Sequence, residues 1–328
     1  MGKCILFGEP MALLIADEVG PLEQVEHFTR AMSGAEVNVS IGLTRLGHSV
    51  EYLTRLGDDP FGHYIANALQ DAGIGTSLIS FDPVYRTGIQ LKNRVTDGSD
   101  PYAPYYRKGS AASHISKKEI DEIDLDGVDL IHVTGIPPAL SQTAREATFR
   151  LVERAKEKGI FLTFDPNLRP ALWEDLETMI SVVNQLASMA DVVLPGIAEC
   201  ETLAGTADLE EAADFYHRLG VRTVVIKDGS KGAFVSVEGE PSCHVEGFHV
   251  EKVVDTVGAG DGFAVGVLSG LLEGLPLKDS VRRGNAIGAI QVTSISDNAA
   301  LPERDALQAF MMKYPNGIFL DFRLGQEV

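Results

Sequence analysis

Strand-like and helix-like segments alternate along most of this chain, and this alternation limits the possible folds more than any other feature of the sequence. Short apolar runs at 1–8, 50–55 and 161–164 are typical of buried strands, while 141–158 and 175–189 have the apolar spacing of helices. Such chains form a mostly parallel sheet with helices on both faces, so we predict an α/β fold. The other expected elements are helices at 36–46, 60–72, 209–219 and 262–273 and strands at 130–133, 192–194, 223–226 and 248–254.

Two segments, at about 10–32 and 84–110, interrupt the alternation. Both have β-like patterning and turn residues but no good helix. Either they are long surface loops, which are uncommon in compact domains, or they pair into a small accessory sheet. We favour the sheet and expect it to lie over the carboxyl ends of the main strands as a discontinuous lid that excludes water. The whole chain, 1–328, is then a single domain.

The composition narrows the partners and the compartment. The formal net charge of −19 argues against nucleic acid or an anionic membrane as a partner. Cys4, Cys200 and Cys243 are too widely spaced for a disulfide framework or a zinc site, so we expect free thiols in a reducing cytosol. No apolar stretch approaches about 18 residues, which predicts a cytoplasmic protein without a membrane span.

The run from Asp255 to Phe263, DTVGAGDGF, carries the strongest chemical signal. Gly258 and Gly260 let successive N–H groups turn inward, and the helix expected behind them adds the positive end of its dipole, which makes an anion hole for a phosphoryl group. Asp261 either accepts a proton from an attacking hydroxyl or only caps the helix. A dinucleotide fingerprint would need a third glycine, and no G-x-x-x-x-G-K-[ST] run occurs. The pattern indicates a kinase of small molecules.

Four separated segments resemble signatures of the ribokinase-like (PfkB) family of carbohydrate kinases, and the likeness spans nearly the whole chain. The first, SGAEVNV at 33–39, resembles the N-terminal signature, with Ser33 in place of the family's first glycine. The others are GDDPFG at 57–62, KDGSKG at 227–232 and DTVGAGD at 255–261. The resemblance implies a ribokinase-like fold, with a mostly parallel sheet and a small β-sheet lid, and the activity of a sugar kinase.

The resemblance also implies a mechanism that uses ATP and Mg²⁺. Asp261 would be the general base on the sugar hydroxyl. The backbone at 257–260, which includes Gly258, Ala259 and Gly260, would bind the charge that develops during transfer. Mg²⁺ would bridge the phosphates of ATP, because the sequence supplies few other cations there.

A nucleotide side follows from the same resemblance. Lys227, Gly229 and Gly232 lie in the strand-turn that runs along the nucleotide, unless they form only an ordinary turn at the end of a strand. Asn285, on a later helix, either faces the adenine or lies on the surface. Glu199 matches the family's Asn-x-x-Glu element, which orders Mg²⁺ through water; a solvated carboxylate at the start of a helix is the alternative.

The substrate side resembles the branch of the family that acts on 2-keto-3-deoxygluconate, a sugar acid, to give its 6-phosphate. Most sugar-specific members carry an Asp shortly after the first strand, whereas this chain has GEPM at 8–11. YYRKGSA at 105–111 resembles that branch's lid strand, and DPNLRP at 165–170 resembles its substrate-side loop.

Two arginines support a carboxylate substrate on physical grounds. Arg107 and Arg169 each offer the planar, bidentate and permanently charged partner that a carboxylate needs. Tyr106 would add a hydroxyl donor and a flat apolar face. The alternatives are that Arg107 is a solvated charge on the lid and that Arg169 is a structural partner of Asp165 or Glu174.

The remaining predictions concern the hydroxyl end of the substrate, the competing functions and the assembly. Gly34 and Asn38 would contact the hydroxyl end, where glycine permits close approach of the backbone. A kinase of a neutral sugar such as fructose and a non-catalytic nucleotide- or sugar-binding protein both remain open, and a dehydrogenase is a weaker reading. A homodimer through the exposed lid sheet is also expected.

Overall fold

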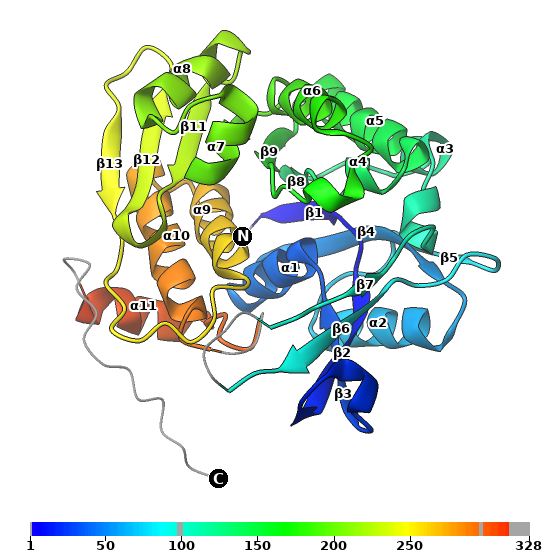
Figure 1. The fold of residues 1–328 in the computed structure, drawn as a ribbon. Helices are drawn as coiled ribbons and strands as arrows, with labels where there is room; N and C mark the ends of the chain where they lie inside the picture. The colour runs from blue at the N-terminus through cyan, green and yellow to red at the C-terminus, as the bar shows by residue number, and fades with distance from the viewer. Residues whose placement is uncertain (1, 97–100, 295–297, 315–328) are drawn as a thin grey trace.

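The computed structural model describes residues 2–96, 101–294 and 298–314, and in this part of the chain nine strands form one central sheet (Figure 1). These strands are β1 (Lys3–Phe7), β4 (Ser49–Gly57), β5 (Ile79–Asp82), β8 (Leu130–Thr134), β9 (Phe161–Asp165), β10 (Val192–Val193), β11 (Thr223–Lys227), β12 (Gly232–Val237) and β13 (Cys243–Glu246). Their order is β13-β12-β11-β10-β9-β8-β1-β4-β5. Neighbours from β11 to β5 pair in parallel, and β12 and β13 add an antiparallel edge. The predicted α/β fold is confirmed.

Helices cover both faces of the sheet (Figure 1). One layer holds α3 (Lys117–Asp121), α4 (Pro137–Leu140), α5 (Gln142–Lys158), α6 (Leu176–Ala187), α7 (Ile197–Ala204) and α8 (Leu209–Arg218), and the other holds α1 (Ala35–Arg45), α2 (Pro60–Asp71), α9 (Ala259–Leu272), α10 (Leu277–Gln291) and α11 (Arg304–Lys313). Alternate residues of β1 divide between two cores, with Ile5 and Phe7 in the first and Cys4 and Leu6 in the second. A strand covered on both faces requires this division.

Helix α5 shows how local sequence sets the bounds of an element. The Ser141 hydroxyl accepts a hydrogen bond from the N–H of Ala144 at 3.0 Å, and Gly159 ends the helix with φ of 67°. Between these caps, Leu151 and Ala155 recur at helical spacing and are fully buried. Burying one leucine side chain contributes about 2 kcal/mol. No helix in the described ranges combines the length and the apolar character that a membrane span needs.

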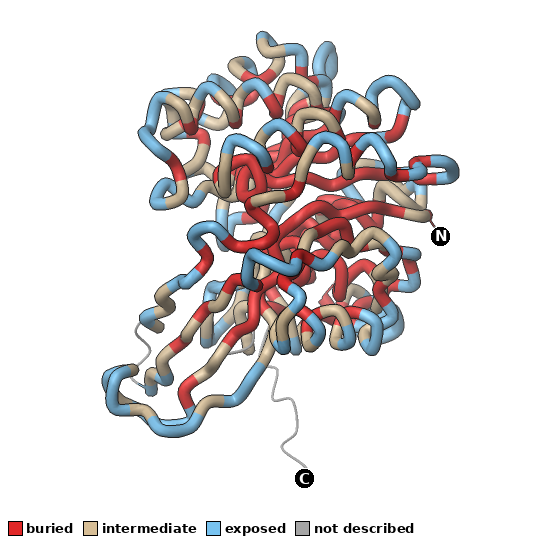
Figure 2. Tube along the Cα trace, turned by 90° about the vertical axis from the view of Figure 1, so that its right-hand side faces the viewer, coloured by how far each residue is buried: buried red, intermediate tan, exposed pale blue. Residues whose placement is uncertain are grey.

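A second, smaller sheet is built from the two segments that interrupt the alternation. It contains β2 (Met11–Val19), β3 (Phe28–Ser33), β6 (Ile89–Arg94) and β7 (Tyr105–Tyr106), in the order β3-β2-β6-β7. Strand β2 pairs antiparallel with β3 and parallel with β6, so both segments contribute to one sheet. Figures 1 and 2 show this small sheet projecting from the body of the protein. Residues 97–100 of the predicted lid lie outside the described residues.

One predicted strand is wrong. Apart from a single bridge residue at His249, residues 248–254 run as an irregular segment. Val253 and Val254 are 54% and 41% exposed, so their β-branched side chains gain little from packing on a sheet. The N–H of Val254 instead donates to the carbonyl of Val292, just after α10, at 2.7 Å. Side-chain type alone therefore predicted a strand where no neighbouring strand supports one.

The helix predicted at 262–273 begins earlier than expected. Helix α9 starts at Ala259, and Gly258 is its N-cap residue. Asp261 consequently lies within the first turn of the helix. This shift decides what the Asp261 side chain can do.

Candidate active site

Polar side chains from distant parts of the sequence meet at the carboxyl edge of the parallel strands. They come from the ends of β1, β9 and β11 and from the first turns of α1 and α9. Asn38 and Asp261, for example, are separated by 223 residues and share a hydrogen bond. A parallel sheet brings the carboxyl ends of its strands to one edge, and open α/β sheets bind ligands there.

The loop before α9 forms a nest of backbone donors. Gly258 has φ of 78°, a left-handed conformation that favours glycine, and this turn leads directly into the helix. Ala259 N–H donates to the carbonyl of Thr256, but the N–H groups of Gly260 and Asp261 have no acceptor among the described residues. Two open donors at the positive end of a helix of 14 residues make a site for an anion.

Asp261 is held by two asparagine side chains. Asn38 Nδ2 donates to Asp261 Oδ2 at 2.8 Å, and Asn167 Nδ2 donates to Oδ1 at 3.4 Å. Because Gly258 is the N-cap, the alternative that Asp261 serves only as a helix cap does not hold. Asn38 contacts the carboxylate of Asp261, which makes it a residue that positions the candidate base.

The pKa of Asp261 is raised to about 6. Burial is the largest cause, because it disfavours the charged form. The hydrogen bond from Asn38 opposes this effect, the negative charge of Asp165 raises the pKa further, and the positive charges of Arg169 and Lys227 lower it. A carboxylate with this proton affinity is better suited to accept a proton near neutral pH than an ordinary Asp.

Lys227 lies between Asp165 and the loop at 255–261. Its Nζ is 2.7 Å from Asp165 Oδ2, and a Cβ built on Gly260 would lie 3.8 Å from the same Nζ. Burial alone would lower the pKa of Lys227, but the carboxylates of Asp165 and Glu199 more than offset it and raise that pKa. The ammonium is therefore charged at neutral pH and faces the start of α9.

Glu199 connects two loops of the site. Its carboxylate accepts the N–H of Gly196 at 2.7 Å and the N–H of Leu168 at 2.8 Å. Burial raises the pKa of Glu199, and the nearby Lys227 charge opposes that rise. A partly buried carboxylate with two backbone donors differs from the solvated carboxylate that was the alternative. Its contact with Mg²⁺ through water stays a prediction.

The predicted nucleotide side lies along β11, β12 and α10. Gly229 belongs to a short 3-10 turn, Gly229–Lys231, and Gly232 opens β12 directly after it. Asn285 is buried, and its Nδ2 donates to the carbonyls of Val245 and Glu246, each at 3.0 Å. The surface alternative for Asn285 is thus excluded, and its amide nitrogen ties α10 to the strand β13.

The base of the small sheet holds Arg107 against Glu9. Arg107 Nε donates to Glu9 Oε2 at 2.6 Å, and the Ser110 hydroxyl donates to the other oxygen of Glu9. Arg107 is 8% exposed, so it is not a solvated lid charge. Gly34 lies beside this pair with φ of 146°, and a Cβ there would be 3.1 Å from the carbonyl oxygen of Glu9.

Arg169 is exposed and has no carboxylate partner in the described part of the chain. Its Nη1 donates to the carbonyl of Leu168 at 2.9 Å. Asp165 pairs with Lys227, and Glu174 pairs with Arg145 at 3.6 Å, so neither of the expected structural partners is used by Arg169. Its positive charge nevertheless reaches Asp261, whose pKa it lowers. Arg169 therefore has its charge available for an acidic ligand close to the candidate base.

Strand register separates two neighbouring tyrosines of β7. Tyr105 pairs with Gln90 and Tyr106 pairs with Ile89, and directly paired residues share one face of a sheet. Gln90 is buried, and the Arg107 guanidinium carbon lies 5.6 Å from the centre of the Tyr105 ring. Tyr106 is 64% exposed on the other face. Tyr105 is itself 49% exposed but shares the face of Gln90, which the sequence analysis did not consider. The substrate contact of Tyr106 stays a prediction.

Comparison with known proteins agrees with this geometry. The family model described as "pfkB family carbohydrate kinase" matches residues 1–304. The chain belongs to this family of carbohydrate kinases. Its ribokinase-like fold and its assignment as a sugar kinase, both predicted from four short segments, are confirmed.

Individual members of the pfkB family are similar along nearly the whole chain. The 2-dehydro-3-deoxygluconokinase of Bacillus subtilis (strain 168) is 44% identical over 308 residues, which cover 94% of each chain. A crystal structure of a PfkB protein from Polaromonas sp. JS666 is 43% identical, with a TM-score of 0.85, and the match covers 94% of this chain and 100% of that one. A fructokinase from Vibrio cholerae O395, in a form with fructose, ADP and calcium ion bound, is 30% identical, with a TM-score of 0.82 and coverage of 94% and 99%.

Sequence reasoning missed three residues of this kinase's candidate site. Glu9 holds Arg107, Asp165 holds Lys227, and Asn167 donates to Asp261. Asn167 has φ of 41°, a left-handed conformation that asparagine tolerates better than most residues. The DPNLRP run, from which the sequence analysis selected only Arg169, also carried the signal for Asp165 and Asn167, because polar residues directly after an apolar strand reach the carboxyl edge of the sheet.

Proposed function

We propose that this pfkB-family kinase transfers the γ-phosphoryl group of ATP to a hydroxyl of a sugar acid, 2-keto-3-deoxygluconate, and produces its 6-phosphate. The observation that carries the proposal is the pairing of Asp261, with its raised pKa, and the two open N–H donors at the start of α9. The 44% identity to a 2-dehydro-3-deoxygluconokinase supports this substrate, since the two names denote the same sugar acid.

Asp261 is the proposed general base. Asn38 and Asn167 hold its two oxygens, so the carboxylate has a fixed direction from which to accept the proton of the attacking hydroxyl. The N–H groups of Gly260 and Asp261 would bind the oxygens of the transferring phosphoryl group. Lys227 would add a positive charge beside that loop.

Arg169 is the proposed main partner of the substrate carboxylate. Its guanidinium is exposed and has no acidic partner in the described ranges, whereas the charge of Arg107 is already offset by Glu9. Arg107 would donate from the nitrogen that Glu9 does not use, in a direction that Glu9 fixes. Tyr105, on the same face as Gln90, would cover the carbon chain, and the backbone at Gly34 would approach the hydroxyl end.

Mg²⁺ is the proposed metal, and the protein offers it limited direct ligation. The described residues contain no group of three or more His, Cys, Asp or Glu side chains that would form a metal centre by themselves. Oxygen donors at Asp165 and Glu199 suit a hydrated Mg²⁺, which they would hold through water while the phosphates of ATP supply the direct ligands. When bound, the metal neutralises phosphate charge. Removal of divalent metal with EDTA is expected to abolish ADP release, and added Mg²⁺ should restore it.

ADP release measured with ATP·Mg²⁺ and 2-keto-3-deoxygluconate, beside fructose and ribose, tests the proposed function. We expect a strong preference for the sugar acid. A preference for fructose would support the second candidate, a neutral-sugar kinase, which the 30% identity to a fructokinase favours. ATP binding without turnover of any of the three sugars would support a non-catalytic binding protein.

We also propose a homodimer through the small sheet. Large apolar side chains are exposed there, including Val19 at 61% and Tyr106 at 64%. Exposed apolar groups on a projecting sheet commonly mark an interface. Light scattering should give twice the chain mass, and Tyr106→Glu should return it to the monomer mass. A clean monomer in the wild type would contradict the proposal.

The cytoplasm is the proposed location. Cys4, Cys200 and Cys243 are free thiols in the structure, and burial raises the pKa of both Cys4 and Cys200 to about 12, which leaves little reactive thiolate. Such thiols fit a reducing compartment. Cell fractionation with an antibody against the protein tests this location.

A further inference from the structure

A buried ion pair joins the small sheet to the loop that precedes α9. Lys92, on β6, places its Nζ 3.3 Å from Asp255 Oδ2 across 163 residues of sequence. The side chains of Lys92 and Asp255 are only 9% and 8% exposed. An ion pair thus joins the small sheet to the loop at 255–261.

Asp255 transmits this contact to the backbone of the loop. Its second oxygen, Oδ1, accepts the N–H of Val257 at 2.9 Å, so the carboxylate defines the turn that leads into Gly258. Lys92 holds one oxygen of this carboxylate while the other shapes the turn. A displacement of the ammonium would therefore change the loop that carries the open N–H donors.

Apart from the N–H groups of Val254 and Asp255, which donate to the carbonyl of Val292, the rest of this loop has little packing to hold it. Val253, Val254 and Val257 are 54%, 41% and 42% exposed, and the segment forms no regular strand. Loops with few buried apolar contacts open at low free energy, so single tethers matter more there than in the core. Lys92 and Asp255 supply such a tether.

Strand register explains why Lys92 points toward the loop. Gln90 and Lys92 are both buried and alternate along β6, so they share one face. Gln90 Oε1 accepts a hydrogen bond from the Ser33 hydroxyl at 2.6 Å, at the junction of β3 with α1. This is the face that the small sheet turns toward the body of the protein.

Stability alone is a weak reason for this pair. Removing two charges from water is costly, and a buried pair often contributes no more to stability than apolar residues of similar size would. Lys92 belongs to the small sheet, however, so its positive charge lies beside the loop only when the small sheet is packed against the body of the protein. The pair is therefore better explained by a coupling between the two parts.

We propose that Lys92 is a positioning residue for phosphoryl transfer, which sets the phosphate loop through Asp255 when the small sheet covers the sugar end. This inference rests on the proposed function, because it takes the 255–261 loop to bind the transferring phosphoryl group. Movement of the small sheet away from the body would release the loop, so that sugar binding and phosphate binding support one another.

Three variants test the coupling. Lys92→Met removes the charge and keeps most of the side-chain length, Lys92→Arg restores the charge, and Asp255→Asn removes the partner's charge but keeps an oxygen for the Val257 N–H. Lys108→Met, at an exposed lysine after β7, is the matched control. We expect Lys92→Met to lower kcat about tenfold and to change the KM for the sugar acid less than about threefold. The control variant Lys108→Met should keep the wild-type kcat and KM.

Rescue and non-additivity separate positioning from a general structural role. Lys92→Arg should recover kcat to within about twofold of wild type. The double variant Lys92→Met/Asp255→Asn should be no slower than the slower single variant, since both remove the same contact. Wild-type kcat in Lys92→Met, or single effects that multiply in the double variant, would overturn the proposal.

Hydrogen exchange of the loop tests the inference without any substrate. The amides of 255–261 should exchange at least about threefold faster in Lys92→Met than in the wild type and in Lys108→Met. Equal exchange in all three proteins would overturn the coupling. A wild-type protein that phosphorylates none of the three sugars would overturn the proposed function only, because the exchange result does not depend on turnover.

Discussion

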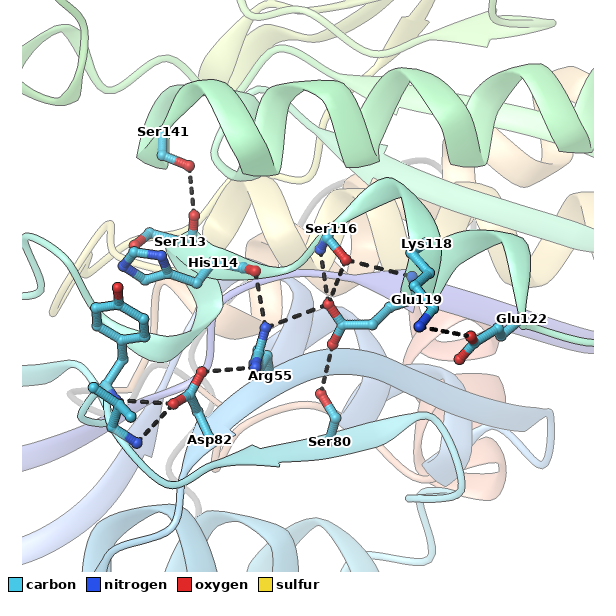
Figure 3. Close-up of polar contacts among 12 residues, drawn as sticks. Arg55, Ser80, Asp82, Ser113, His114, Ser116, Lys118, Glu119, Glu122 and Ser141 are labelled. Carbon is cyan, nitrogen blue, oxygen red and sulfur yellow. Dashed lines mark hydrogen bonds and ion pairs between the residues drawn. The ribbon is translucent and has the colours of Figure 1, made fainter.

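The β5 edge of the central sheet and the candidate active site hold their carboxylates in opposite ways. At this edge, Arg55 bonds Asp82 at 2.8 Å and Glu119 at 3.4 Å, and it also donates to the carbonyl of His114 at 3.0 Å (Figure 3). One guanidinium thus joins β4, β5 and α3. In the candidate active site, Asp261 is bonded by the amides of Asn38 and Asn167, and no cation contacts it directly among the described residues.

The pKa values of the two aspartates move in opposite directions as a result. Burial alone would raise the pKa of Asp82, but the N–H groups of Tyr85 and Val84 and the charge of Arg55 outweigh it, so that pKa is lowered. For Asp261, the effect of burial outweighs the hydrogen bond from Asn38 and the charges of Arg169 and Lys227, which lower the pKa, and the pKa rises to about 6. A direct cation fixes a carboxylate as a structural anion, whereas neutral amides fix its position and leave its proton affinity high.

Asp261→Asn should have the largest effect and would remove one side of this comparison. The variant keeps the shape of the side chain but has no basic oxygen, so kcat should fall roughly 10²–10⁴-fold. ADP release measures this loss, and calorimetry should find ATP binding nearly unchanged. Normal turnover would refute the assignment of the base.

Arg169→Ala tests whether the unpaired guanidinium near Asp261 recognises a carboxylate. The KM for the sugar acid should rise about 10–100-fold, while the KM for a neutral sugar should not change. Arg218→Ala, at an exposed arginine on α8, is the control with the same loss of charge. Equal increases for the acid and the neutral sugar would contradict carboxylate recognition.

Asp82→Asn breaks the other side of the comparison and should affect stability without affecting chemistry. We expect the free energy of unfolding at pH 7 to fall by about 2 kcal/mol with kcat unchanged, because Arg55 loses a buried partner. The folded-state pKa of Asp82 is lowered, so its contribution is present above the unfolded pKa of about 4 and is lost as pH falls through the folded-state pKa. Urea unfolding at pH 7 and pH 4 should show the difference between wild type and variant shrinking in acid.

The pH dependence of kcat/KM is the prediction with the smallest expected effect. Protonated Asp261 cannot accept a proton, so kcat/KM should fall below about pH 6 and approach a tenfold loss per further pH unit. Because the Arg169 charge lowers the pKa of Asp261, Arg169→Ala should move this acid limb to higher pH. A limb that stays in place would show that Arg169 does not act on the base.

Local sequence was enough for most of the fold. Ser141 and Gly159 end α5 where the pattern predicted, because capping and turn preferences act within a few residues. The segment at 248–254 was misread, since β-branched residues predict a strand only where a neighbouring strand receives them. The start of α9 moved to Ala259 because the left-handed turn at Gly258 is part of the helix cap.

The sequence by itself determined the α/β class and the family, and it singled out Asp261 as the candidate base, because a glycine-rich turn before a helix is a local signal. Only the tertiary structure decided which partners each charge has. The pairs Arg107–Glu9, Lys92–Asp255 and Asn38–Asp261 cross 98, 163 and 223 residues, so strand order and register set them. Register also placed Tyr105 and Tyr106 on opposite faces, since a shift of one residue along a strand moves a side chain to the opposite face.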